Sequence, residues 1–546
     1  MSENSPGKKN TSCKLIAAFI ALSSHLIMHQ IDVTSVHFSV AFEIPINNIS
    51  IYFSKLFSFR CMLIAAGTAS ELVVSELSKK VDPRGNQRIR KFFSMGSFVV
   101  VLIFRVIFLF YLYKSSQLGY YVYVILSIEA LFFGYFHASV IGLVPEHSLA
   151  VAFAVNVSRF FILFIQLILD ALLGKKPLLM IKFQVWIGVL MTGGAVVAWI
   201  YFNFGLCYTI SPDDLEYLEE CANESSEPDK KTNIIVESPK LWEYFFSSKP
   251  MKFVFERVPI KPSENCISIP IGTNVEVVVE EKGFGITFYR ALSPFLMFFG
   301  GSMFKDFLFP GVLPYALVRR DRCHTINMLV PVANILGPIV LFVDESRLFP
   351  KWTPYFDGFW SLLILMIMVA VSAFMTIHSR AAIFRGFINS PVKVAYLTLT
   401  LVFCNGFMDP LSFAGVAKMV KKGFESETKE ENIKLLEKFP QNGGSRDNNS
   451  QTTSSEENRS KVTKFEGSNS LLTVHILSAL FMRFVFSKLS VGYNDTRVSL
   501  GYCLPKFRPN HKMSRYNTGW YIFRQTFIRA WKDTGSDFKL DVKKYL

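Results

Sequence analysis

Charged and polar side chains inside long apolar runs are the residues of this sequence whose types could carry chemistry. A charged side chain at the centre of a membrane helix costs about 2.5–3.5 kcal/mol, so it tends to face other helices or a water-filled path. Asp32, Arg159 and Asn405 lie deep within such runs and are candidates for binding a polar solute. Asp32 is also the best candidate for carrying a proton, because carboxyl groups form the proton relays of many transporters.

Other charged residues in the same runs have a structural interpretation. Arg105 and Glu129 lie in neighbouring runs, and pairing between two helices for structure alone would explain both. A long side chain near the end of a span can instead extend its charge to the membrane interface. This is the expectation for four residues: Arg60, Glu71, Asp306 and Arg483.

Neither a metal centre nor an enzyme active site is expected. His25 and His29 share a helix face one turn apart, but two ligands alone are a weak indication of a metal. The eight cysteines include no Cys-x-x-Cys pair, which predicts neither a metal site nor a disulfide framework. The sequence has no HExxH, no GxSxG and no phosphate-binding loop, so we expect no enzyme and no cofactor.

Long apolar segments are the elements that must position these residues. Of the 546 residues, 51% are hydrophobic and only 18% are charged, against about 25% in soluble domains. About eleven segments are long enough to cross a hydrocarbon core of about 30 Å as helices. The predicted spans are 14–41, 50–77, 92–113, 119–144, 148–174, 183–206, 286–312, 324–343, 357–378, 391–417 and 470–488. They divide the chain into a six-span half (14–206), a central hydrophilic loop (207–285) and a five-span half (286–488).

Polar segments outside the spans have their own expected roles. Residues 1–13 form a short N-terminus, and the insert 421–468 is expected to be disordered because its low hydrophobicity cannot repay the entropy of ordering. The tail 489–546 is basic and carries aromatic residues at near-helical spacing. This favours an amphipathic helix lying on the membrane, with a helix packed on the protein as the alternative. The net charge of +15 fits contacts with membrane lipid, and nucleic acid is not an expected partner.

Basic residues between the spans predict the orientation. The connection Lys79–Lys91 is the densest short basic loop and is therefore expected on the cytoplasmic side. Two spans precede it, so the N-terminus is expected to be cytoplasmic. An odd number of spans then places the C-terminus outside, an assignment that the basic tail opposes. The plasma membrane is favoured over an internal membrane, and the oligomeric state stays open.

The order of six spans, a hydrophilic loop and five spans resembles the equilibrative nucleoside transporter family, whose architecture is major-facilitator-like. Several local stretches along about residues 14–490 support the resemblance. Phe309-Pro310-Gly311-Val312, for example, stands where the family has an FPAV segment. The other stretches are Arg88–Phe98, His137–Leu143, Asp344–Arg347 with Trp352, and Phe403–Phe407.

The sequence departs from this family at positions that grip the nucleoside. Met28-His29 stands for a Trp-Asn pair in the first helix, and Arg159 stands at a glycine of the fifth helix. In the eighth helix, Asn334 and Pro338 replace the acid and the arginine of a D-x-x-G-R motif. Charge-assisted hydrogen bonds are roughly twice as strong as neutral ones, so Asn334 would hold a ribose more weakly than a carboxylate. A positive Arg159 would suit an anionic solute.

Together these features predict an all-α polytopic membrane protein with about eleven transmembrane helices in a 6+5 major-facilitator-like arrangement. The expected function is facilitative transport of nucleosides, nucleobases or another small polar metabolite by alternating access around a site at the membrane midplane. The alternative is a non-transporting scaffold or surface protein on a transporter-like fold, which the loss of the acid and arginine pair favours. The residues expected to line the site are His29, Asp32, Asn156, Arg159, Asn334 and Asn405.

Overall fold

A computed structural model describes most of the membrane-spanning part of the chain and the C-terminal tail. The described residues are 6–81, 86–114, 117–144, 147–174, 176–204, 277–282, 284–337, 339, 354–379, 381–421, 462–467, 470–504, 507 and 509–546. Most of the central loop 207–285 and most of the insert 421–468 lie outside the described residues, as do Pro338 and Asp344–Arg347.

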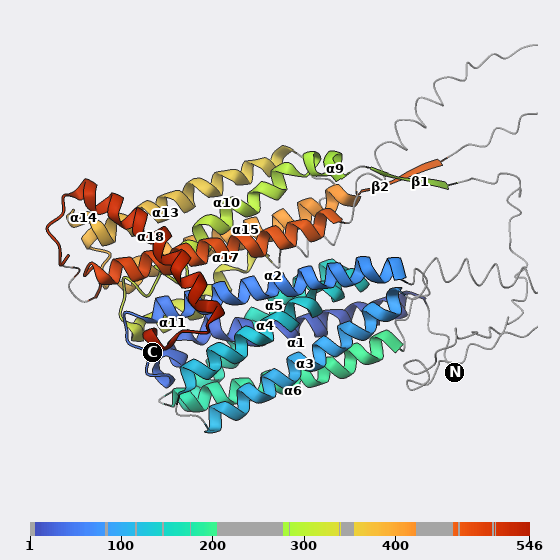
Figure 1. Cartoon of the computed structure of the whole chain (residues 1–546), viewed down its shortest axis with the longest axis horizontal. Coiled ribbons are helices and arrows are strands. Elements are labelled where there is room, and N and C mark those ends of the chain that lie inside the picture. The colour runs from blue at the N-terminus through green and yellow to red at the C-terminus, as the bar shows by residue number, and fades with distance from the viewer. Residues whose placement is uncertain are drawn as a thin grey trace, which may run out of the picture.

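The first half consists of six helices, each of which contains most of one predicted span (Figure 1). Their bounds are α1 (Pro6–Ala41), α2 (Ile49–Val81), α3 (Asn86–Lys114), α4 (Leu118–Leu143), α5 (Ser148–Leu173) and α6 (Pro177–Phe204). Helix α1 packs on α5 and α6, and α4 packs on α2 and α3.

The second half contains α9 (Phe284–Arg290), α10 (Leu292–Leu308), α11 (Arg320–Ala333), the 3-10 helix η2 (Pro354–Trp360), α13 (Ser361–His378), α14 (Ala382–Arg385), α15 (Pro391–Lys421) and α17 (Ser470–Ser499). Helix α10 ends at Leu308 because Pro310 and Pro314 cannot continue an α-helix, as the sequence predicts. Helix α17 runs eleven residues beyond the predicted end at 488.

Nine helices among the described residues are long and apolar enough to cross a membrane. Helices α10, with 17 residues, and α11, with 14, fall short of that length but lie in the bundle beside them. The protein is therefore a helical, multi-pass integral membrane protein. The N-terminal end of α1 and the C-terminus lie at opposite ends of the bundle (Figure 1), which is the arrangement that an odd number of crossings produces.

The two halves meet along two seams. Helix α2 runs beside α17, and α11 packs against both α1 and α5. Short strands β1 (Val277–Lys282) and β2 (Val462–Gly467) pair in parallel at the N-terminal end of the bundle (Figure 1). The two strands lie beyond the ends of the helices, so the bundle itself is all-α as predicted, while β2 lies in the insert where no ordered structure was expected.

Buried ion pairs fasten the helices of the first half together. Arg105 donates to Glu129 Oε1 at 3.0 Å and to Thr192 Oγ1 at 2.6 Å, and Arg60 donates to Glu129 Oε2 at 3.1 Å. The expected pairing of Arg105 with Glu129 is confirmed. The expectation that Arg60 reaches the interface is wrong, because Arg60 is buried and pairs with Glu129. Glu71 accepts a hydrogen bond at 2.6 Å from Arg90 of the predicted cytoplasmic connection, so its place at the interface stays a prediction. Partners one helix away satisfy the charges of Arg60 and Arg105 inside the bundle.

The C-terminal helix α18 (Arg515–Phe538), followed by a short 3-10 helix η4 (Lys543–Tyr545), folds back onto the end of the bundle. Asp533 accepts hydrogen bonds from Lys55 of α2 at 2.7 Å and from Lys488 of α17 at 2.6 Å. Asp537 pairs with the same two lysines. These four residues, here called the α18 clamp, tie one helix of each half to the tail.

The clamp decides part of the prediction for the tail. One face of α18 packs on α17, so on this face the alternative, a helix packed on the protein, describes the structure. The other face exposes Trp520, Phe523, Phe527 and Trp531, and its contact with the membrane stays a prediction. Helix α18 packs on α17, so α17 continues as a helix through the polar residues 489–499, beyond its apolar segment.

One expectation about cysteine chemistry changes, and the expectation about metals stays a prediction. Cys13 is disulfide-bonded, although no disulfide framework was expected. Four other cysteines are free: Cys61, Cys323, Cys404 and Cys503. Among the described residues, His25 and His29 have no third ligand close enough to complete a metal site with them. A different cluster, His37, Asp170 and His324, has three potential ligand atoms close together.

Candidate functional site

Three of the predicted site residues lie together where α1 faces α5. His29 Nδ1 lies 3.4 Å from the Nε atom of Arg159 and 3.9 Å from a carboxylate oxygen of Asp32. Asp32 follows His29 by three residues, so both point to one side of α1. We call His29, Asp32 and Arg159 the central polar group. They combine a donor, an acceptor and an imidazole that can play either role.

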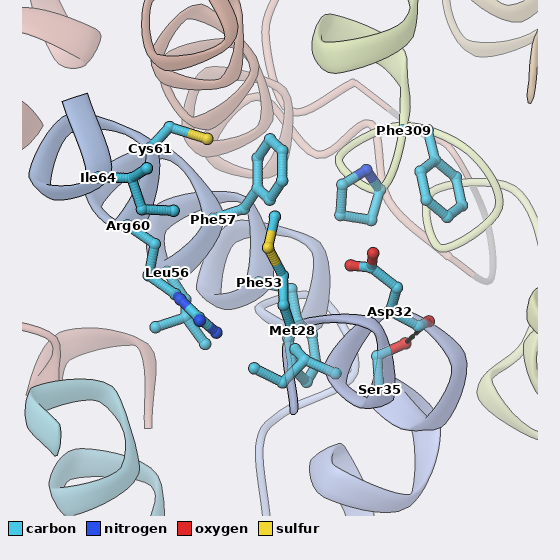
Figure 2. Close-up of a pocket in the computed structure, with 12 residues that line it drawn as sticks. Met28, Asp32, Ser35, Phe53, Leu56, Phe57, Arg60, Cys61, Ile64 and Phe309 are labelled. Atoms are coloured by element: carbon cyan, nitrogen blue, oxygen red, sulfur yellow. Dashed lines mark hydrogen bonds between the residues drawn. The ribbon is translucent and has the colours of Figure 1, made fainter. Parts of the chain in front are cut away.

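Asp32 also lines a small cavity between the halves (Figure 2). The cavity measures about 30 Å³, which is room for about one water molecule. The carboxylate of Asp32 points into the space between α1 and Phe309, and the side chain of Asp32 is 36% exposed. Most of the wall comes from α1 and α2, and the second half contributes Phe309 and Pro310. The other lining residues are Met28, Ile31, Ser35, Phe53, Leu56, Phe57, Arg60, Cys61 and Ile64.

Arg159 is an incompletely paired cation at the junction of the halves. Its side chain is half-buried, and among the described residues no carboxylate oxygen lies within ion-pair distance of it. Asp32 of the first half and Asp409 of the second half are the acids that act on it electrostatically. The Nε–H of Arg159 donates to His29, so the four N–H groups on its two terminal nitrogens can still donate to an entering anion.

Asn156 and Asn334 each lie at a close approach between helices, Asn156 between the halves and Asn334 within the second half. The Oδ1 atom of Asn156 is 3.4 Å from the place that a Cβ would take at Gly337. The Oδ1 atom of Asn334 would lie only 2.4 Å from a Cβ at Gly406, so only glycine fits there. Both amides donate to carbonyl groups of their own helical segments, Asn156 to Ala152 at 2.9 Å and Asn334 to Val330 at 3.3 Å.

Asn405 is separated from the other candidates. Its Oδ1 atom faces Gly301 of α10, 3.2 Å from the place of a Cβ there, so the side chain lies between two helices of the second half. The structure therefore brings His29, Asp32 and Arg159 together. Asn156 faces Gly337 across the halves, Asn334 faces Gly406 within the second half, and the side chain of Asn405 turns toward α10.

Two charged residues of the second half, Arg483 and Asp306, were expected at the membrane interface but form ion pairs inside the bundle. Arg483 donates to Asp409 at 2.6 Å, and its guanidinium stands 5.2 Å from the centre of the Phe298 ring. Asp306 is buried and pairs with Lys305 at 2.9 Å. The expectation for Arg483 and Asp306 is wrong, because Asp409 of α15 pairs with Arg483, and the buried Asp306 pairs with Lys305 of its own helix α10.

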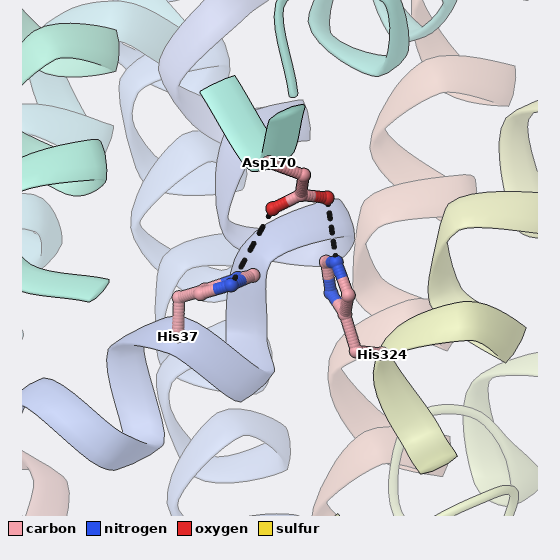
Figure 3. A group of neighbouring side chains, drawn as sticks. All are labelled: His37, Asp170 and His324. Carbon is pink, nitrogen blue, oxygen red and sulfur yellow. Dashed lines mark hydrogen bonds and ion pairs between the residues drawn. The ribbon is translucent and has the colours of Figure 1, made fainter. Parts of the chain in front are cut away.

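Sequence reasoning missed one cluster completely. His37, Asp170 and His324 come from α1, α5 and α11 and converge near the C-terminal end of the bundle (Figure 3). His324 Nε2 lies 2.8 Å from Asp170 Oδ2, and His37 Nε2 lies 3.6 Å from Asp170 Oδ1. Asp170 was noted as a charge within a span, but no spacing along the chain links three residues that are more than a hundred positions apart.

No protein-family model and no curated protein matches the chain. Among solved structures, a crystal structure of tetrameric PepTSo2 is similar over 97% of this chain and 97% of that chain, with 11% sequence identity and a TM-score of 0.42. The fold and the site described above follow from the helices and side chains of this chain and not from that likeness.

Proposed function

We propose that this protein is a membrane transporter that moves a small polar solute by alternating access, with no catalytic step. The support is the arrangement of the bundle. Two groups of helices meet along α2 and α17 and along α1, α5 and α11, and polar side chains that are only partly paired lie at that junction. Rocking of one group against the other around such a junction is the usual way for transporters to alternate access.

Arg159 is the observation that carries this proposal. A positive side chain is costly inside a membrane protein, and it is usually paired unless a function requires it to be free. Within the described part of the chain, the one side-chain hydrogen bond of Arg159 is to His29 Nδ1 at 3.4 Å, while Asp409 is already paired with Arg483. We infer that the solute carries an acidic or strongly hydrogen-bond-accepting group that Arg159 binds.

The solute class is a nucleoside, a nucleobase or another small polar metabolite. Membership in the equilibrative nucleoside transporter family, suggested by the sequence, is part of this proposal. Asn334 in place of a carboxylate weakens the grip on a ribose, and Arg159 favours an anion, so we rank small anions above neutral nucleosides. The plasma membrane is the proposed location.

A non-transporting scaffold is the second candidate, and the α18 clamp favours it. Two buried lysines from different halves share two aspartates of the tail, so the halves are tied together at this end. A transporter must be able to loosen such a contact during its cycle, whereas a scaffold need not.

Uptake into vesicles separates the two candidates. The purified full chain is reconstituted and tested with labelled nucleosides, nucleobases and small organic anions, beside the variant Arg159→Gln. Arg385→Gln serves as the matched control, because Arg385 is exposed on α14. We expect flux of at least one anion that Arg159→Gln reduces and Arg385→Gln retains. Flux equal to that of empty vesicles across the whole panel would support the scaffold.

A further inference from the structure

We propose that His37, Asp170 and His324 form a binding site for one zinc-type divalent metal ion between the two halves of the bundle. Each residue offers one ligand atom, and the three atoms lie within 4.8 Å of one another (Figure 3). The two imidazole rings stand nearly perpendicular, at 87°, with their centres 4.3 Å apart. Both Nε2 atoms therefore converge on the same carboxylate from different helices.

The donor set fits Zn²⁺ or a similar transition metal better than Ca²⁺ or Mg²⁺. Imidazole nitrogen suits Zn²⁺, Co²⁺ and Ni²⁺, whereas Ca²⁺ and Mg²⁺ prefer sites made of oxygen alone. Bonds of about 2.0–2.2 Å in a tetrahedron separate neighbouring ligand atoms by about 3.3 Å. The observed separations of 3.6 Å for His37 and 2.8 Å for His324 from Asp170 lie on either side of that value. Three protein ligands leave a fourth position open to water.

Neighbouring side chains hold the carboxylate of Asp170 by hydrogen bonds, but none that the structure describes bonds to the second ring nitrogen of either histidine. Gln166 donates to Asp170 Oδ1 at 2.6 Å, and Gln184 donates in turn to Gln166, so the carboxylate is held in place. The Nδ1 atoms of His37 and His324 have no hydrogen-bond partner among the described residues. Missing second-shell partners cost about 10- to 100-fold in metal affinity. We therefore expect an affinity in about the micromolar range rather than that of a structural zinc site.

A bound ion would join the halves at the end of the bundle that carries the α18 clamp. His37 and Asp170 belong to the first half and His324 to the second. Two residues before His37 on α1, Ser35 pairs with Tyr315 of the second half at 2.5 Å, and Asn327 donates to Ser35 at 3.0 Å. The metal would thus reinforce an existing polar contact between α1 and the second half.

Metal binding can be tested without any transport measurement, so its outcome is independent of the proposed function. The purified full chain in detergent micelles is titrated with Zn²⁺ against a chromophoric chelator, and with Co²⁺ followed by visible absorption. We expect one equivalent to bind, with the absorption of a four-coordinate Co²⁺ that has nitrogen and oxygen ligands. His37→Gln and His324→Gln should each weaken binding more than about 100-fold, and Gln166→Ala about 10- to 100-fold.

Two further variants keep the test decisive. Asp170→Asn keeps the size of the side chain and one oxygen that can accept from Gln166 but removes the negative charge, so it decides the matter if a histidine variant fails to fold. His147→Gln is the matched control, because His147 lies before α5 and forms no side-chain capping hydrogen bond. The control should bind as the unaltered chain does. Equal Zn²⁺ affinity of the unaltered chain and the His37→Gln, His324→Gln and Asp170→Asn variants, including no binding by any of them, overturns the proposal.

Discussion

The α18 clamp and the central polar group both place opposite charges between helices, but they differ in how completely those charges are paired. In the clamp, two lysines and two aspartates pair at 2.6–2.7 Å or closer, and their side chains are 0–6% exposed. In the central polar group, Arg159 has an imidazole at 3.4 Å and no described carboxylate at ion-pair distance, and Asp32 is partly open to a cavity.

This difference in pairing indicates which charged side chains are available to a ligand. A charge that is fully paired and buried contributes to structure, and breaking its pair leaves an uncompensated ion. A charge that is partly paired and accessible can exchange a weak protein contact for a stronger ligand contact. The clamp therefore holds the tail, and we propose that the central polar group binds the solute.

The largest expected effect is on the clamp. Lys55→Met removes one ammonium group from two buried aspartates, and breaking a buried pair in this way costs about 3–5 kcal/mol. Undocking of α18 should become more than about a hundredfold more frequent. Limited proteolysis of the tail in micelles measures it.

The matched control for this variant is Lys544→Met. Lys544 is 61% exposed and lies 3.9 Å from Asp495, so its contribution should be below about 1 kcal/mol. If the tail of Lys55→Met resists protease as well as the tail of Lys544→Met, the clamp does not hold α18.

A smaller effect on stability and a larger effect on function are expected at Asp32. Asp32→Asn keeps the shape of a partly exposed side chain, so the free energy of unfolding should change by less than about 1 kcal/mol. If the transport cycle carries a proton on Asp32, the variant should lose the dependence of flux on pH. Parallel flux measurements at several pH values check this, and a pH dependence that survives unchanged would rule out Asp32 as the proton carrier.

The smallest effect is the pH response of the clamp. Burial alone would raise the pKa of Asp533, but Lys488 and Lys55 outweigh it and hold the pKa below 3.8. Burial raises the pKa of Asp537 above its usual value, and the charge of Asp533 adds to this. Asp533 therefore stabilises docking above pH 3.8 and loses that contribution as the pH falls through its lowered pKa. Asp537 has the opposite effect. Its pKa is higher in the docked state, so its contribution to docking grows as the pH falls toward that pKa.

Docking of α18 should accordingly stay constant or strengthen slightly as the pH falls from about 7 to about 4, and weaken below that. Hydrogen exchange of the α18 amides, corrected for the intrinsic effect of pH, measures this. Asp537→Asn should remove the slight strengthening and keep the loss at low pH. Steady weakening from neutral pH downward would contradict the assignment of the two pKa directions.

Local chemistry made much of the fold predictable. Apolar length marked the spans, and Pro310 and Pro314 marked the end of α10. The pairing of Arg105 with Glu129 followed because two opposite charges in adjacent spans had few other partners. Depth along a span was a poorer guide for Arg60, Asp306 and Arg483. Side chains from neighbouring helices paired with Arg60 and Arg483, and Lys305 of the same helix paired with Asp306.

What the sequence could not supply were contacts between distant segments. The clamp joins Lys55 to a helix almost five hundred residues later, and the aromatic residues of α18 gave no sign of the aspartates on its other face. His37, Asp170 and His324 share no motif, so only the packing of α1, α5 and α11 brings them together. Asn405 failed to join the other candidates for the same reason, because the rotation of α15 turns it toward Gly301.

The most direct test of the central claim is the uptake of labelled small organic anions by vesicles that contain the full chain or Arg159→Gln. The structure gives Arg159 no ion-pair partner among the described residues, so its loss should leave folding intact and lower anion flux by about tenfold or more, as expected for a charged hydrogen bond worth about 1.5–3 kcal/mol. Equal flux in the two proteins, at equal amounts of folded protein, would contradict the claim that the central polar group binds the solute.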